Sequence, residues 1–134
     1  MNLLLDTHIL LWTLTDDFRL VPRARMLIDY PDNMVFFSIV SIWEIEIKRL
    51  AHPDKMSFSA DDVISYCKES GFHLIPIKIG HVLKLRELGR NPNAPPHKDP
   101  FDRIMICQAL AENMLFLTHD HLLSDYNVSC VLTV

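Results

Sequence analysis

Short hydrophobic runs along the chain alternate with longer amphipathic segments. The runs at 2–5 ("NLLL") and 34–38 ("MVFFS") have the length and composition of strands that are buried on both faces. Similar runs at 72–77 and 114–118 predict a third and a fourth strand. Residues 129–132 predict a short last strand.

The segments between these runs have helical spacing or helix-capping residues. The predicted helices cover residues 7–14, 22–30, 39–50, 60–70 and 79–88, and a last helix begins at Pro100. Ser59 and Asp62 are suited to cap the fourth helix, and Asp99 is suited to cap the last one. Strands that alternate with helices predict an α/β fold with a central, mostly parallel sheet of four to five strands.

The length of the chain fits one domain that spans residues 1–134, because 134 residues with 49% hydrophobic content can form one compact core. No apolar run reaches the roughly 18 residues that a membrane helix needs. Asp6 and His8 interrupt the N-terminal apolar segment, which also lacks a basic start, so we do not expect a signal peptide. The three cysteines are widely spaced, which favours buried thiols in a reducing cytoplasm. We therefore expect a cytoplasmic protein without membrane contact.

The charge balance is acidic, with 17 Asp and Glu residues against 13 Lys and Arg residues and a net charge of −4. This balance argues against a protein that holds nucleic acid by charge alone. It does not exclude a nuclease, because bound divalent cations reverse the sign of the charge locally.

Four acidic residues fall where such a fold places its ligands. Asp6 ends the first strand, Asp120 follows the fourth, Asp102 lies in the first turn of the last helix, and Glu44 lies in the second turn of the helix after the second strand. Ligands of open α/β sheets bind beyond the carboxyl ends of the strands. Carboxylates crowded there repel one another, and a bound Mg²⁺ or Mn²⁺ ion would relieve the repulsion.

Each acidic residue also has a structural alternative. The alternatives are a turn for Asp6, a favourable helix-dipole position for Asp102, and helix caps for Asp99 and Asp120. Glu44 could form a capping box with Ser41 or an ion pair with Lys48.

Three histidines flank these acids: His97, His119 and His121. The "HDH" segment resembles a pair of zinc ligands, but alternating loop residues rarely converge and no cysteine joins them, so we do not expect structural zinc. A role in orienting a phosphate or transferring a proton remains open.

Four segments in order and spacing resemble the acidic motifs of PIN-domain ribonucleases: "NLLLDTHILLW", "SIWEIEIK", "HKDPFDRIMICQA" and "LFLTHD". More narrowly, they are similar to VapC-type toxins of bacterial toxin–antitoxin pairs. The likeness covers essentially the whole chain. It implies a PIN-like three-layer α/β/α domain.

The resemblance also implies which residues form the site. The family's catalytic, metal-binding acids fall on Asp6, Glu44, Asp102 and Asp120. Asp102 is chosen within "DPFDR" because it stands seven residues before Ala109. Asp99 belongs to the extended motif of a subgroup, and its role stays open. Thr7 and Thr118 resemble positions where the family carries a hydroxyl near the metal.

The implied function is that of a metal-dependent endoribonuclease, which uses Mg²⁺ or Mn²⁺ to activate the water that hydrolyses RNA. A homodimer and a cognate antitoxin are the implied partners. Candidate contacts to the RNA backbone are Lys48, Arg49, Arg86, Arg90, Lys98 and Arg103.

Alternatives are a PIN nuclease that acts on DNA or structured nucleic acid, and a non-catalytic PIN-shaped binding module. A phosphatase with Asp6 as nucleophile is a further rival, but "LDTH" lacks the second aspartate of the D-x-D loop.

Overall fold

The central sheet has five parallel strands in the order β3-β2-β1-β4-β5 in this computed structural model, which describes all residues from 1 to 134. The strands are β1 (Asn2–Leu5), β2 (Met34–Ser38), β3 (His73–Ile75), β4 (Leu115–Thr118) and β5 (Val131–Thr133). The sheet therefore confirms the predicted parallel architecture. Its five strands are the larger of the two numbers expected from the sequence.

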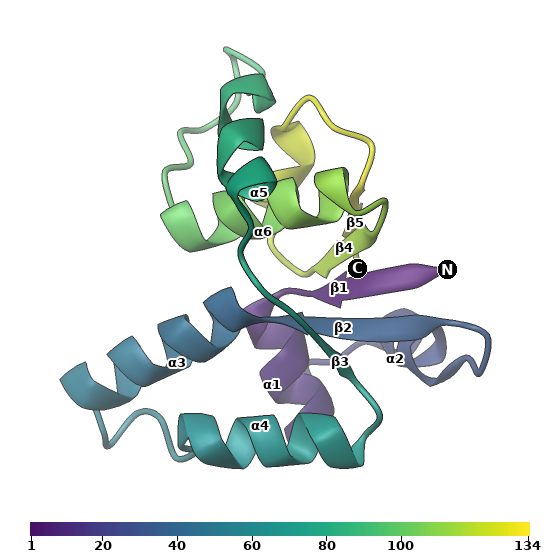
Figure 1. Ribbon diagram of the computed structural model, residues 1–134, viewed down its shortest axis with the longest axis vertical. Helices are drawn as coiled ribbons and strands as arrows, with labels where there is room; N and C mark the ends of the chain where they lie inside the picture. Colours follow the sequence, from purple (N-terminus) through teal and green to yellow (C-terminus); the bar gives the residue numbers. More distant parts are fainter.

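Helices cover both faces of this sheet, as Figure 1 shows. The helices are α1 (Thr7–Thr15), α2 (Pro22–Asp29), α3 (Ile39–Ala51), α4 (Ala60–Glu69), α5 (Ile79–Leu83) and α6 (Pro100–Ala111). Helices α1 and α4 lie on one side of the sheet, and α5 and α6 lie on the other (Figure 1). Two short 3₁₀ helices, η1 (Lys84–Glu87) and η2 (His121–Asp125), complete the α6 side. The three-layer α/β/α prediction is confirmed.

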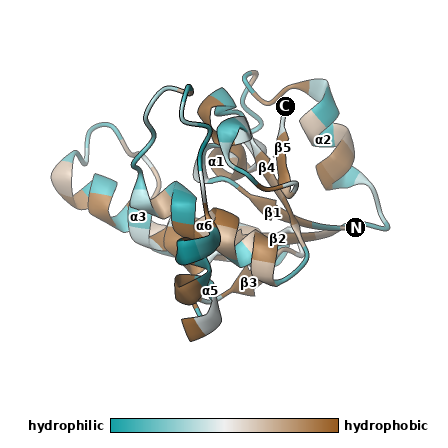
Figure 2. Cartoon of the chain, turned by 90° about the horizontal axis from the view of Figure 1, so that it is seen from above, coloured by the Kyte–Doolittle hydropathy of each residue, from teal (hydrophilic) through white to brown (hydrophobic).

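The central strand β1 is buried on both faces, which explains its uninterrupted hydrophobic sequence. Leu3 and Leu5 contribute to the core beneath α1 and α4, while Leu4 points to the opposite core beneath α6. All three are fully buried. Figure 2 shows the strands as a hydrophobic band between helices that carry hydrophilic outer surfaces.

The path of the chain creates a switch point next to β1. The chain adds β2 and β3 on one side of β1 and then returns to add β4 and β5 on the other side. The carboxyl ends of β1 and β4 are neighbours, and the backbone N–H of Asp6 donates to the carbonyl of Leu117 at 3.0 Å. Open α/β sheets bind their ligands at such a point.

Two predicted elements are shorter than expected. The third strand covers His73–Ile75 and not 72–77, because Pro76 has no N–H to donate to a neighbouring strand. The predicted helix at 79–88 divides into α5 and the 3₁₀ helix η1. The last strand also lies later than predicted, at Val131–Thr133.

The capping interactions agree with the prediction in one helix and not in another. Ser59 and Asp62 form the expected capping box of α4. Helix α3 begins at Ile39 and is capped by Ser38, whose hydroxyl accepts a hydrogen bond from the N–H of Val40 at 3.0 Å. The alternative in which Ser41 and Glu44 form a capping box is therefore wrong. No helix has the length and apolar character needed to cross a membrane.

Candidate functional site

Asp6 and Asp120 are linked at the switch point by one hydroxyl group. The Asp6 carboxylate accepts a hydrogen bond from the N–H of His8 at 2.9 Å and another from the hydroxyl of Thr118 at 2.5 Å. The same Thr118 oxygen accepts a hydrogen bond from the N–H of Asp120 at 3.0 Å. Thr118, the last residue of β4, therefore ties the ends of two adjacent strands together.

The environment of Asp6 opposes its negative charge. Asp6 is only 4% exposed, and this burial raises the pKa of its carboxyl, although hydrogen bonds from Thr118 and His8 lower it. The charge of Glu44 raises the pKa of Asp6 further. Asp6 and Glu44 are therefore close enough to interact electrostatically.

Glu44 is held by α1 and by its own helix. Its Oε1 accepts a hydrogen bond from Thr7 Oγ1 at 2.8 Å, and its Oε2 lies 2.8 Å from Lys48 Nζ. Because the proton of Thr7 is used on Glu44, the Ser41 hydroxyl at 2.9 Å acts as donor to Thr7. The alternative Glu44–Lys48 ion pair is present, and it partly balances the charge of this acid.

Asp102 lies in the first turn of α6, and the pKa of its carboxyl is raised like that of Asp6. Burial raises the pKa of its carboxyl to about 8, and the charges of four neighbouring acids contribute: Asp6, Asp99, Glu44 and Asp120. These acids come from four separate parts of the chain. The expected convergence of negative charge therefore centres on Asp102.

Asp99 serves as the N-cap of α6. Its Oδ1 accepts hydrogen bonds from the N–H groups of Phe101 at 2.8 Å and Asp102 at 3.4 Å. Its side chain is exposed. The proposed structural alternative for Asp99 is therefore present, and its charge reaches Asp102 through space.

A histidine joins two of the acids in a tight group. One ligand atom each of His97, Asp102 and Asp120 lies within 4.8 Å of the other two. His97 Nε2 is 3.1 Å from Asp102 Oδ2. Asp6 and Glu44 lie outside this group, and their carboxylates are occupied by hydroxyl and lysine partners. The sequence left the role of His97 open, although it lies in the same "HKDPFDR" segment as Asp102.

Tyr126 orients His97 and was not recognised from the sequence. Its hydroxyl lies 2.7 Å from His97 Nδ1 and 3.3 Å from the carbonyl oxygen of His97. Burial lowers the pKa of the His97 imidazole, and the positive charges of Arg90 and Arg103 lower it further, against the opposing effect of Asp120 and Asp99. The neutral ring is therefore favoured.

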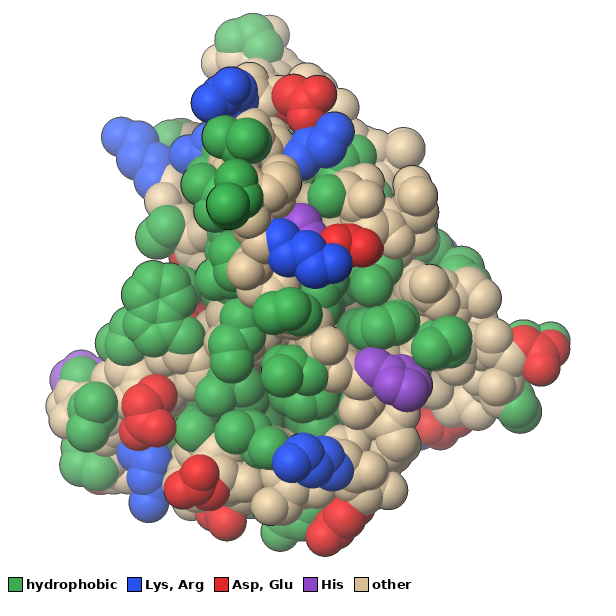
Figure 3. All heavy atoms as spheres, in the orientation of Figure 1, with side chains coloured by type: hydrophobic (Ala, Val, Ile, Leu, Met, Phe, Trp, Pro, Cys, Tyr) green, Lys and Arg blue, Asp and Glu red, His purple; other side chains and the backbone are tan.

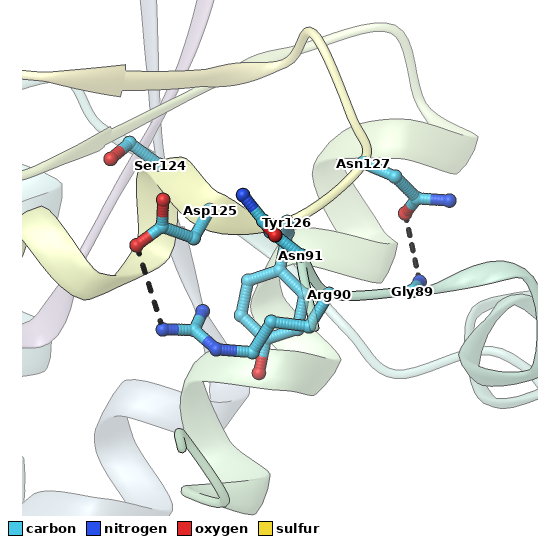
Figure 4. Close-up of a pocket in the computed structure, with 7 residues that line it drawn as sticks. All are labelled: Gly89, Arg90, Asn91, Ser124, Asp125, Tyr126 and Asn127. Atoms are coloured by element: carbon cyan, nitrogen blue, oxygen red, sulfur yellow. Dashed lines mark hydrogen bonds and ion pairs between the residues drawn. The ribbon is translucent and has the colours of Figure 1, made fainter. Parts of the chain in front are cut away.

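Arg90, a predicted RNA contact, instead supports Tyr126. Its guanidinium lies 4.9 Å from the centre of the Tyr126 ring and donates to the carbonyls of Pro95 and Leu122. Figure 4 shows the two side chains stacked beside a surface hollow of about 430 Å³. The Arg90 side chain is 14% exposed, so its guanidinium contacts other groups of the protein and not the solvent.

Two adjoining hollows open the site to the surface. The smaller one has about 270 Å³ and is lined by Asp6, His8, Trp12, His119 and Asp120. The larger one has about 530 Å³, and its twelve lining residues include His8 and Trp12 again together with Arg19, Lys48 and Lys55. The two acids are therefore reached from an aromatic and basic surface. Arg19 and Lys55 were not among the predicted RNA contacts.

His119 and His121 do not join the group around Asp102. Their rings lie 5.8 Å apart, and His119 Nδ1 is 2.6 Å from the carbonyl oxygen of Val134. This contact occupies one ring nitrogen of His119. His119 also packs edge-on against Trp12 at 5.5 Å in the smaller hollow.

Solved structures share this fold at low sequence identity. VapBC2 from Rickettsia felis, bound to a DNA fragment from its promoter, has a TM-score of 0.69 at 15% identity and covers 99% of this chain and 98% of that chain. VapBC-1 from nontypeable Haemophilus influenzae has a TM-score of 0.57 at 16% identity, covering 93% and 94%. A domain of a functionally unknown protein from Methanocaldococcus jannaschii has a TM-score of 0.56 at 11% identity, covering 99% and 90%.

No curated protein sequence matches this chain. The family model of the PIN domain matches residues 3–128, which is nearly the whole chain. The match agrees with the parallel sheet and its flanking helices. The chain belongs to the PIN domain family.

Proposed function

We propose that this PIN domain is a metal-dependent endoribonuclease that acts as the toxin of a VapBC-type toxin–antitoxin pair. Membership of a nuclease family supports the hydrolase activity. Two of the similar solved structures are VapBC complexes, which supports the narrower toxin reading. The observation that carries the proposal is the close approach of groups from distant segments: one ligand atom each of His97, Asp102 and Asp120 lies within 4.8 Å of the other two, and the Thr118 hydroxyl links Asp6 to Asp120.

The donor atoms fit a hard divalent cation. Mg²⁺ and Mn²⁺ prefer carboxylate oxygens, and the site offers the carboxylates of Asp6, Glu44, Asp102 and Asp120. The excess negative charge would be relieved by such an ion. When bound, the cation supplies Lewis acidity that polarises a phosphate oxygen and acidifies a water molecule.

The protein's own side chains keep the carboxylates in position. Thr118 donates to Asp6 and Thr7 donates to Glu44, so each hydroxyl orients one acid of the site. Each Asp6 oxygen accepts one hydrogen bond and keeps a lone pair for a cation, and "LDTH" lacks the second aspartate of a phosphatase that uses the first as nucleophile. Water is therefore the proposed nucleophile.

The surface beside the acids is suited to a nucleic acid strand. Arg19 and Lys48 line the larger hollow, where they can contact phosphates although each also pairs with an acid. Trp12 lines both hollows, and a base could stack on its ring in place of the Arg19 guanidinium, which lies 5.1 Å from the ring centre. Stacking requires unpaired bases, which favours single-stranded RNA over duplex DNA.

Replacing Asp102 by Asn tests the proposed activity. Asp102→Asn keeps the shape of the side chain but removes the charge on which the acids converge, so RNA cleavage in Mn²⁺ or Mg²⁺ should fall at least about a hundredfold. The readout is the mapping of cut RNA ends with purified protein. Asp32→Asn, which removes an exposed acid in a turn, is the matched control.

Two results would contradict the proposal. One is undiminished cleavage by Asp102→Asn in a preparation free of other nucleases, and the other is equal cleavage by the natural protein in a metal chelator. A DNA strand of the same sequence distinguishes the alternative of a DNA nuclease. RNA binding without any cleavage would support the alternative of a non-catalytic binding module.

A further inference from the structure

One neighbour of Asp102 offers a nitrogen atom and not a carboxylate. His97 lies in the loop before α6, and its side chain is 6% exposed. Its Nε2 is 3.1 Å from Asp102 Oδ2, and the group also includes an oxygen of Asp120 within 4.8 Å. The imidazole edge therefore faces the carboxylates and not the solvent.

The hydrogen bonds of Tyr126 allow a state of the ring that leaves this nitrogen free. If His97 Nδ1 carries the proton, it donates to the Tyr126 oxygen at 2.7 Å, and the Tyr126 hydroxyl donates to the carbonyl oxygen of His97 at 3.3 Å. Both protons are then used, and Nε2 carries a lone pair. Histidines that bind metals usually donate their other ring N–H in this manner.

In this state two electron-rich atoms face each other. The lone pair of Nε2 and the Asp102 carboxyl are 3.1 Å apart. A protonated carboxyl can donate to this lone pair, and next to the ionised carboxylate a cation would take the place of that proton. Adjacent ligands of an octahedral ion with bonds of about 2.1 Å are about 3 Å apart. The observed separation therefore matches that of two neighbouring ligands on one ion.

The position of Tyr126 is fixed independently of any ion. The Arg90 guanidinium stacks on the Tyr126 ring, and the backbones of the two residues form an isolated antiparallel β-bridge. Gly89 and Asn127 exchange two further hydrogen bonds, from Gly89 N to Asn127 Oδ1 at 2.8 Å and from Asn127 N to Gly89 O at 2.9 Å (Figure 4). The support of His97 is therefore built into the fold, as a metal site of defined geometry requires.

We propose that His97 Nε2 is a direct ligand of the cation held by Asp102 and Asp120, and that this site prefers Mn²⁺ to Mg²⁺. The inference rests on the proposed metal-dependent function and deepens it. Imidazole is a common ligand of transition metals, whereas Mg²⁺ is bound almost entirely through oxygen. One nitrogen among the donors therefore favours Mn²⁺.

The competing interpretation is that His97 only positions Asp102. In that case Tyr126 donates to Nδ1, and Nε2–H donates to the carboxylate at the same 3.1 Å. The two interpretations differ in whether nitrogen contacts the ion. That contact has a spectroscopic signature.

Pulsed electron paramagnetic resonance of bound Mn²⁺ provides the test. With histidine labelled by nitrogen-15, the natural protein should show a nitrogen coupling that changes with the label. The coupling should persist in His8→Gln, His119→Gln and His121→Gln, which remove the other histidines near Asp120, and disappear in His97→Gln. Titration should show Mn²⁺ binding weakened at least about tenfold in His97→Gln, with a smaller loss for Mg²⁺.

The outcomes separate this inference from the proposed function. Mn²⁺ bound without a nitrogen coupling, or with one that survives His97→Gln, would overturn the His97 ligand while leaving a metal-dependent nuclease intact. Failure of the natural protein to bind Mn²⁺ would overturn both. The labelled natural protein and the His8→Gln, His119→Gln and His121→Gln variants decide the question by elimination even if His97→Gln does not fold.

Discussion

Asp102 combines a favourable position with an unfavourable environment. The N-terminal turn of α6 attracts a negative charge, but burial and four neighbouring acids hold the pKa of this carboxyl at about 8. The second effect is larger, because the net shift is upward. The Asp102 carboxyl therefore binds a proton more strongly in the folded than in the unfolded chain.

This upward shift predicts how stability depends on pH. Between the pKa of about 3.8 in the unfolded chain and about 8 in the folded protein, the folded state binds more protons, so its stability should fall as pH rises. In metal-free buffer, the melting temperature of the natural protein should drop between about pH 6 and about pH 8.5, as measured by differential scanning calorimetry.

Two comparisons isolate the contribution of Asp102. Asp102→Asn should flatten this pH dependence, since it removes the carboxyl whose pKa is raised. Millimolar Mn²⁺ should raise the melting temperature most at the higher pH, because the ion favours the ionised carboxylates. A melting temperature that is independent of both pH and Mn²⁺ would mean that the acids are not crowded as described.

At the scale of elements, the start of α6 sets the position of the site. Asp99 caps the helix and Asp102 lies in its first turn, so the two acids of "DPFDR" have different tasks in one helix end. The cap fixes where the helix begins and hence where Asp102 points. The main task of Asp99 is therefore to cap α6, and its charge near Asp102 is secondary.

Two substitutions separate these tasks. Asp99→Ser keeps a capping oxygen and removes the charge, so we expect stability within a few tenths of a kcal/mol and RNA cleavage within a fewfold of the natural protein. Asp99→Ala removes both and should cost about 1 kcal/mol in urea unfolding. Loss of cleavage in a stable Asp99→Ser protein would instead place Asp99 among the residues that hold the cation.

Most elements could be predicted because their cause is local. The apolar runs before Asp6 and after Asn113 predict buried strands, and the "S-x-x-D" segment at Ser59 predicts a helix start. The boundary errors have local causes too, but weaker ones: Pro76 ends β3 early, and Ser38 competes with Ser41 as the cap of α3.

The contacts between loops could not be predicted. His97 and Tyr126 are 29 positions apart, and they meet because Arg90 and Asn127 hold two irregular segments together. No periodicity or capping pattern reports such a contact. Asp6 and Asp120 could be placed because strand ends have a known position in a parallel sheet, whereas a loop histidine has none.

At the scale of the whole molecule, one face remains strongly apolar. Figure 3 shows hydrophobic side chains gathered across the middle of the face on which α5 and β3 lie. The exposed apolar residues of this segment are Leu74, Ile77, Ile79, Val82 and Leu83. A continuous apolar surface of this kind marks a protein–protein contact. We expect it to pair two copies of the chain as a homodimer.

A charge placed in this face should disrupt the dimer. Ile79, which is 81% exposed, tolerates replacement in the monomer, so Ile79→Lys should shift the protein from dimer to monomer in sedimentation velocity. Met26→Lys is the matched control, because Met26 is 74% exposed on α2. A natural protein that sediments as a monomer, or an Ile79→Lys dimer of unchanged affinity, would refute this assignment of the face.

The order of the strands has a consequence for biosynthesis. Thr118 and Asp6 are 112 positions apart, so the strand that carries Thr118 can join the first strand only after the long segment between them has been made. Under the proposed function, a ribosome that stops before this strand emerges releases only a fragment without the assembled acids. A cell would thus be spared cleavage of its own RNA by unfinished copies of the toxin.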